Sequence, residues 1–135
     1  MPYSLEAEQA ILGAILTNPR LIEEVPRLKA DDFYLSQHKV IFETMYDLAA
    51  SSKPIDVVLI LESLEKSKQY DGPDAAKYIK LLIDSSVLSG NVVEYADIIC
   101  NKAVLRKLID ASRETAEEAY SGEREVDSIL DRAEQ

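Results

Sequence analysis

The sequence predicts an all-α protein, and three observations support this. Gly and Pro are few, with 4 Gly and 5 Pro among 135 residues. Apolar residues recur at spacings of three and four, which places them on one face of a helix. Residues 92–120 contain neither Gly nor Pro, a pattern typical of one long helix. We expect a compact helical lobe over residues 1–86, followed by a protruding helical hairpin over residues 91–135 whose second arm is cut short.

The first helix is expected after Ser4, which can cap it. Glu6 and Glu8 follow in the first turn, where the helix dipole favours negative charge. The run 10–16 is apolar on nearly every face, which predicts a central core helix. Gly13 within this run costs about 1 kcal/mol relative to alanine. We therefore expect another helix to approach closely there.

The next segment opens with Asn18-Pro19, a sequence typical of a helix start. A short helix is expected to run to about Leu28. The connection that follows contains Phe33 and Tyr34, and both aromatic rings are expected to be buried.

Four further helices are expected between residues 36 and 120. The first covers 36–50, the second follows a cap at Asp56, and the third follows a turn in which Asp74 can act as the cap. After a break at residues 87–90, one helix runs over 92–120.

A last break at residues 121–123 leads into an amphipathic helix that starts near Asp127. The apolar side chains of the long helix continue beyond the part that the lobe can cover. Two isolated helices bury too little surface to be stable alone. A partner chain is the expected cover for the hairpin.

The charge argues against direct nucleic-acid binding. Lys+Arg is 15 and Asp+Glu is 25, which gives a net charge of −10. Proteins bind the nucleic-acid polyanion mainly through Lys and Arg. Lys102, Arg106 and Lys107 could form a local basic patch, although solvated charges on a long helix are the favoured interpretation.

Motifs for nucleotide, metal or nucleophilic chemistry are missing from the sequence. The glycines are too widely spaced for a phosphate-binding loop, so no cofactor is expected. Cys100 and His38 are the only cysteine and histidine, too few for a disulfide or a zinc site. His38 is expected to have a structural role with a local hydrogen bond. With no signal peptide and no apolar run long enough for a membrane span, we expect a cytoplasmic protein.

Several segments in order are similar to one family. The opening Pro2-Tyr3-Ser4-Leu5-Glu6-Ala7-Glu8-Gln9-Ala10-Ile11-Leu12-Gly13 resembles the start of the N-terminal domain of bacterial DnaB-type replicative DNA helicases. The matching segments that follow are Asp32-Phe33-Tyr34, His38-x-x-Ile41-Phe42, Pro54-Ile55-Asp56, Tyr78-Ile79, Asn91-x-x-x-Tyr95-Ala96 and Lys102-x-x-x-Arg106. The departures from the family pattern, near residues 52–53, 72–76 and 87–90, fall in predicted loops.

The resemblance implies an assembly role without catalysis. In this family the domain forms a collar on a hexameric ring, its hairpins pair into dimers, and the collar docks the C-terminal domain of primase. The ATP and Mg of the helicase belong to a RecA-like ATPase domain, which has no counterpart in these residues. A helicase loader is a further expected partner.

The resemblance also directs the choice of site residues. For self-association we expect Ile98, Ile99, Leu105, Leu108 and Ile109. For the surface that faces primase we expect Glu6, Tyr78, Ile109 and Thr115. The alternatives are a DNA-binding helical module, which the charge opposes, a helical enzyme, which lacks convergent ligands, and the related helicase-binding domain of primase, whose sequence elements match less well.

Overall fold

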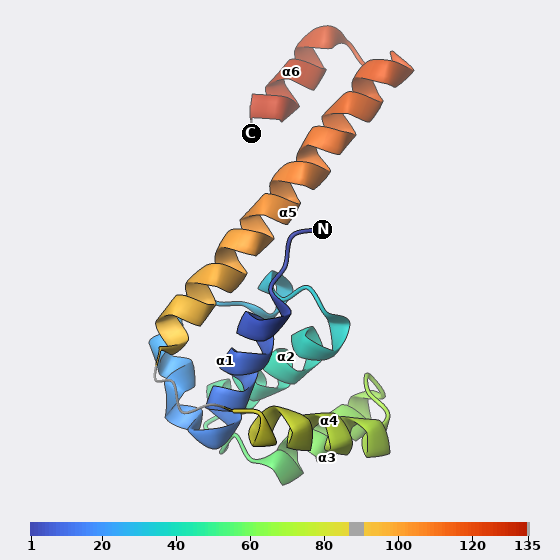
Figure 1. Ribbon diagram of the computed structural model, residues 1–135. Coiled ribbons are helices and arrows are strands. Elements are labelled where there is room, and N and C mark those ends of the chain that lie inside the picture. The colour runs from blue at the N-terminus through green and yellow to red at the C-terminus, as the bar shows by residue number, and fades with distance from the viewer. Residues whose placement is uncertain (87–90, 135) are drawn as a thin grey trace. The chain divides into compact units, whose positions relative to one another are not determined.

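The structure, a computed structural model, describes residues 1–86 and 91–134, and within these ranges it contains helices and no strand (Figure 1). This confirms the predicted all-α class. No helix in the described ranges is both long enough and apolar enough to cross a membrane. The α-helices are α1 (Leu5–Thr17), α2 (Ser36–Ala50), α3 (Val57–Ser67), α4 (Gly72–Asp84), α5 (Val92–Ser121) and α6 (Val126–Glu134), with the 3-10 helices η1 (Pro19–Glu24) and η2 (Ala30–Asp32) between α1 and α2.

The chain divides into two compact units. We call Tyr3–Ala103 the lobe, and Met1–Pro2 together with Val104–Gln135 the hairpin unit. The division falls inside α5, whereas the sequence placed it between residues 86 and 91. The difference arises because the first part of α5 contributes Val92, Ala96 and Ile99 to the core of the lobe. The predicted break at 87–90 lies outside the described residues.

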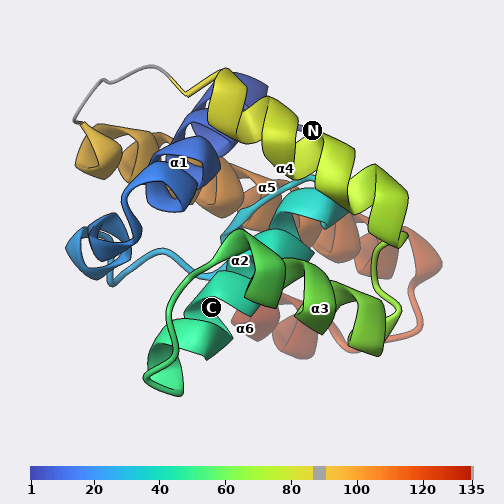
Figure 2. The same cartoon turned by 90° about the horizontal axis from the view of Figure 1, so that it is seen from below.

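Helix α1 is the central element of the lobe. It packs against α4, α2 and η1, and Figure 2 shows it beside α4. The Ser4 hydroxyl accepts a hydrogen bond from the Ala7 backbone N–H at 3.2 Å, as the sequence predicted. Ile11, Leu12 and Ile15 are fully buried, which confirms that α1 is a core helix.

Gly13 is the point of closest approach between α1 and α4. A Cβ atom placed there would lie 2.6 Å from the carbonyl oxygen of Leu82 and 3.3 Å from the Cβ of Ser86. The absence of a side chain therefore lets the α4 backbone pack directly on α1, which confirms the close approach predicted from the sequence.

The segment between α1 and α2 differs from the prediction. It forms the short 3-10 helix η1, which ends at Glu24, because Pro26 disfavours a helical conformation at Val25. Phe33 is buried as expected, but Tyr34 is 39% exposed, so the prediction for Tyr34 was wrong. The backbone at Phe33 is extended, and neighbouring side chains of an extended chain point to opposite sides. The Tyr34 ring instead stacks on Tyr3, with centroids 4.4 Å apart.

Helices α3 and α4 complete the lobe. The Asp56 side chain caps α3 by accepting from the Val58 N–H at 2.6 Å, as predicted. Helix α4 begins earlier than expected, at Gly72, so that Asp74 lies in its first turn and is not the cap. Pro73 fits this position because the first turn of a helix does not need its N–H.

In the hairpin unit, α6 follows the end of α5 and turns back beside it (Figure 1). Glu118 of α5 forms ion pairs with Arg132 of α6 and with Arg124 of the connection. The Arg106 guanidinium donates to the Pro2 carbonyl oxygen at 2.8 Å. One cation of the basic patch considered above is therefore already engaged within the unit.

The first prediction concerns the contact at Gly13. Replacing Gly13 with alanine is expected to destabilise the protein by about 1–3 kcal/mol, because the added methyl group meets backbone that cannot move independently. Urea denaturation measures the change. Gly72→Ala is the matched control, since nothing lies within 4 Å of a Cβ at that position. Equal stability of Gly13→Ala and the wild type would contradict the close packing.

Candidate protein-interaction surfaces

A buried polar network joins three helices of the lobe. His38 of α2 and Glu8 of α1 are both buried, and Nδ1 of His38 lies 2.7 Å from Oε1 of Glu8. Nε2 of His38 lies 2.6 Å from the hydroxyl oxygen of Tyr78 on α4. The Tyr78 ring also stacks on the imidazole, with centroids 5.7 Å apart. The sequence predicted a structural histidine with a local partner, but the partners lie far away in the chain.

The Glu8 carboxyl group also holds the chain that enters α2. It accepts hydrogen bonds from the backbone N–H of Tyr34 at 2.9 Å and of Leu35 at 3.4 Å. Since both of its oxygens accept, His38 donates to it from Nδ1. The amide of Gln9 donates to the Tyr78 hydroxyl at 3.3 Å, and that hydroxyl can then donate to Nε2 of His38. Each polar atom of the network has a partner, as burial requires.

Glu8 was expected only as an acidic residue of the first helical turn, and its place in the core was not predicted. A signal was present in the sequence. Glu8, Ile11, Leu12 and Ile15 follow the spacing of a single buried helix face. A glutamate on that face requires buried hydrogen-bond partners. The sequence could not show which residues these were.

Cys100 offers no reactive thiol. Burial raises the pKa of its thiol above the ordinary value, and the neighbouring Asp32 raises this pKa further, while Arg27 lowers it. The protonated thiol, a poor nucleophile, is therefore favoured at neutral pH. Within the described residues, no three His, Cys, Asp or Glu side chains gather where a metal ion could bind.

One pocket of the lobe brings together two of the predicted site residues. It has a volume of about 360 Å³ and is lined by Ser4, Glu6, Ala7, Gln9, Ala10, Ser85, Tyr95 and Ile98. Glu6 had been assigned to primase binding and Ile98 to self-association. Tyr78 lies next to this pocket through its contact with Gln9. Glu6, Tyr78 and Ile98 therefore belong to one region of the lobe.

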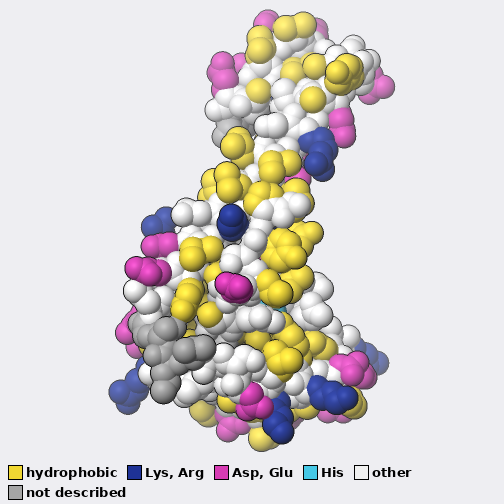
Figure 3. Space-filling view, in the orientation of Figure 1, with side chains coloured by type: hydrophobic (Ala, Val, Ile, Leu, Met, Phe, Trp, Pro, Cys, Tyr) yellow, Lys and Arg dark blue, Asp and Glu magenta, His cyan; other side chains and the backbone are white. Residues whose placement is uncertain are grey.

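In the hairpin unit, an apolar face of α5 is open to solvent. Leu108 is 61% exposed, and Val104 and Leu105 are exposed as well. Figure 3 shows hydrophobic side chains along this part of the chain. Ile109 is half-buried, and so is Thr115, whose hydroxyl donates to the Ala111 carbonyl oxygen at 2.9 Å. These residues are available for contact with another protein.

The prediction that Ile99 takes part in self-association was wrong. Its side chain is 1% exposed and belongs to the core of the lobe. Adjacent residues on a helix diverge by about 100°, so Ile98 reaches the surface while Ile99 faces inward. A buried side chain cannot contact a partner, and Ile99 is therefore removed from the set.

Three exposed apolar residues at the far end of the hairpin unit were not selected from the sequence. Tyr120 is 92% exposed, and Val126 and Leu130 on α6 are also exposed. The amphipathic pattern of the last helix was the available signal. The sequence could not show that these side chains stay exposed, because that depends on how α5 and α6 pack.

The second prediction concerns Glu8. Glu8→Ala is expected to destabilise the lobe by about 3 kcal/mol or more, because two backbone N–H groups and the imidazole lose their buried acceptor. Urea denaturation followed by circular dichroism measures the loss. Glu8→Gln, which keeps one acceptor oxygen, is expected to cost less. Glu6→Ala on the same helix is the exposed control, and an equal loss in both alanine variants would refute the role of Glu8.

Comparison with known proteins is consistent with this geometry. Residues 1–101 match the family described as the DnaB-like helicase N terminal domain. The chain is 39% identical to the replicative DNA helicase DnaB of Pasteurella multocida over 98% of its own length, but it spans only 29% of the length of that relative.

Two solved structures share the fold. The crystal structure of the N-terminal domain of DnaB helicase from Mycobacterium tuberculosis superposes with a TM-score of 0.89 at 30% identity, covering 98% of this chain and 95% of that one. The N-terminal domain of DnaB helicase from Helicobacter pylori superposes with a TM-score of 0.73 at 28% identity, covering 84% and 89%. The sequence match, the shared helices and their arrangement agree, and the chain belongs to the family of DnaB-like helicase N-terminal domains.

Proposed function

We propose that the chain is an assembly module of a replicative DNA helicase, which pairs with a second copy through its hairpin unit and docks primase. The exposed apolar face of α5 in the hairpin unit is the observation that carries the pairing. Leu105 and Leu108 lie one helical turn apart and are both exposed. Side chains three apart face the same side of a helix, so the two leucines can meet a partner together.

We propose that a second copy of the chain covers this face. Fully burying an aliphatic side chain stabilises by roughly 1.5–3 kcal/mol, and a two-fold interface buries each such residue twice. Burial of the exposed aliphatic residues of α5 and α6 would therefore favour pairing. In the full helicase, such pairs would assemble further into a hexameric collar, as the family resemblance implies.

Besides a second copy of the chain, primase is the other proposed partner. The structure of the Helicobacter pylori domain, 28% identical to this chain, is described together with its interactions with primase. We assign contact with primase to Glu6 and Tyr78 of the lobe, and separately to Ile109 and Thr115 of the hairpin unit. The pocket beside Glu6 provides a concave feature for a partner side chain.

The proposal leaves ATP hydrolysis and DNA translocation to another part of the helicase. The motif for nucleotide binding is missing from these 135 residues. The net charge of −10 opposes contact with DNA. A helicase loader is a further proposed partner, to which no particular surface is assigned.

The third prediction tests pairing. Leu105→Asp and Leu108→Asp are each expected to weaken self-association by roughly tenfold or more, because a charge would be buried at the interface. Light scattering coupled to size exclusion, over a range of concentrations, measures the mass. Val58→Asp is the control, since Val58 is also an exposed aliphatic residue but lies on α3 of the lobe. An unchanged mass for both leucine variants would rule out this face.

The fourth prediction tests docking of the C-terminal domain of primase. Tyr78→Ala is expected to weaken binding by about tenfold, because aromatic rings often dominate interfaces. Tyr78→Phe retains the ring and is expected to bind nearly normally, since the hydroxyl is engaged inside the lobe. Titration calorimetry gives the affinities, and circular dichroism checks that the helical signal is unchanged. Normal binding by Tyr78→Ala would remove this residue from the docking surface.

A further inference from the structure

A second surface of the lobe is a groove between α2 and the segment 22–31. One part has a volume of about 390 Å³ and the adjoining part about 320 Å³. Both parts are lined by the same four residues, Pro26, Leu28, Phe42 and Tyr46. Of these four residues, Pro26 and Tyr46 are exposed, whereas Leu28 and Phe42 are buried. The groove shares no lining residue with the pocket at Glu6.

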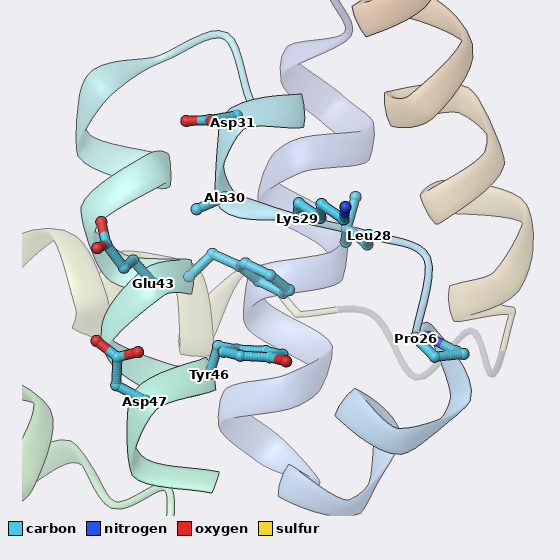
Figure 4. Close-up of a pocket in the computed structure, with 9 residues that line it drawn as sticks. Pro26, Leu28, Lys29, Ala30, Asp31, Glu43, Tyr46 and Asp47 are labelled. Carbon is cyan, nitrogen blue, oxygen red and sulfur yellow. The ribbon is translucent and has the colours of Figure 1, made fainter. Parts of the chain in front are cut away.

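Tyr46 gives the groove its most distinctive feature. Its side chain is 57% exposed, and in Figure 4 its ring extends from α2 toward Pro26. Within the described parts of the chain, the Tyr46 hydroxyl has no hydrogen-bond partner. Tyrosine can bury its ring against a partner while its hydroxyl stays polar, and an aromatic face also attracts a cation. An aromatic ring left open in a concave site is suited to contact with another molecule.

The rim of the groove is acidic. Its carboxylates are Glu23, Asp31, Glu43 and Asp47, and Lys29 is the only cation among the lining residues. Figure 4 shows Glu43 and Asp47 on the same stretch of α2 as Tyr46. None of the four carboxylates forms an ion pair with another described residue. Arg27, the nearby cation in the sequence, lies close enough to Cys100 to lower the pKa of that thiol.

We propose that this groove binds a basic segment of a partner protein, which places an apolar side chain against the exposed Tyr46 and Pro26 and Lys or Arg side chains against the rim. Charge complementarity selects this occupant. Four carboxylates around the exposed Pro26 and Tyr46 favour a cationic segment and repel nucleic acid. A second copy of this chain is disfavoured because the chain has a net charge of −10. The groove and the assembly surfaces proposed above are separate sets of residues.

The experiment uses the whole chain and a labelled short peptide of lysines and leucines as the probe. Fluorescence anisotropy at low salt measures its affinity. One control peptide replaces the lysines with glutamate, and the other replaces the leucines with serine. Both controls are expected to bind at least about tenfold more weakly, because the groove requires the charges and the apolar anchors together. Equal binding of the serine peptide would overturn the proposal, since it would show non-specific attraction to an acidic protein.

Variants of the protein locate the site. Glu43→Lys and Asp47→Lys are each expected to weaken peptide binding by about fivefold, and Tyr46→Ala by about tenfold. Asp84→Lys is the matched control, because Asp84 is exposed at the end of α4 and does not line the groove. This control is expected to retain affinity within about twofold. Circular dichroism checks folding, and the two α2 charge variants decide the outcome if Tyr46→Ala unfolds.

Three further results would overturn the proposal. The first is failure of the lysine–leucine peptide to bind, and the second is an equal loss of affinity in Asp84→Lys and the groove variants. The third is a lower mass of the groove variants in light scattering, which would show that a second copy occupies the groove. Selective loss in the groove variants, with unchanged mass, would support it.

Discussion

The carboxyl group of Glu8 is the polar centre on which the lobe depends. It accepts from His38 of α2 and from the backbone N–H groups of Tyr34 and Leu35, and His38 carries the connection on to Tyr78 of α4. A buried carboxyl group is costly unless each acceptor is satisfied. Helices α1, α2 and α4 must therefore keep one relative placement for this group to remain buried. Apolar packing alone would tolerate small shifts that these short distances do not.

The second constraint on the same helices is the absence of a side chain at Gly13. The α4 backbone at Leu82 packs where a Cβ atom would otherwise stand. The polar network and the close approach thus both act on the packing of α1 against α4. Together they position the start of α1, whose outward side lines the pocket at Glu6 and Ile98. The part of the proposed primase surface at Glu6 and Tyr78 is therefore positioned by the packing of α1 against α4.

Helix α5 serves both units through different sets of side chains. Val92, Ala96 and Ile99 belong to the core of the lobe, whereas Leu105 and Leu108 in the hairpin unit stay exposed. The same helix therefore contributes to folding in its first part and offers an apolar face in its later part. Such an exposed face suits self-assembly, because the same face of a second copy can cover it. The acidic groove at Tyr46 adds a surface of different chemistry, suited to a cationic partner.

The sequence alone determined the features that depend on near neighbours in the chain. The caps at Ser4 and Asp56, the need for close packing at Gly13, the uninterrupted α5 and the family resemblance were all readable, because capping, helix periodicity and motif order are local properties. Only the tertiary structure decided the partners of Glu8 and His38, the exposure of Tyr34, the burial of Ile99 and the groove at Tyr46. Each of these depends on residues tens of positions away, or on which of two adjacent side chains faces the core. A chain's local pattern specifies its helices, but the contacts between helices determine which polar groups are satisfied and which surfaces remain open.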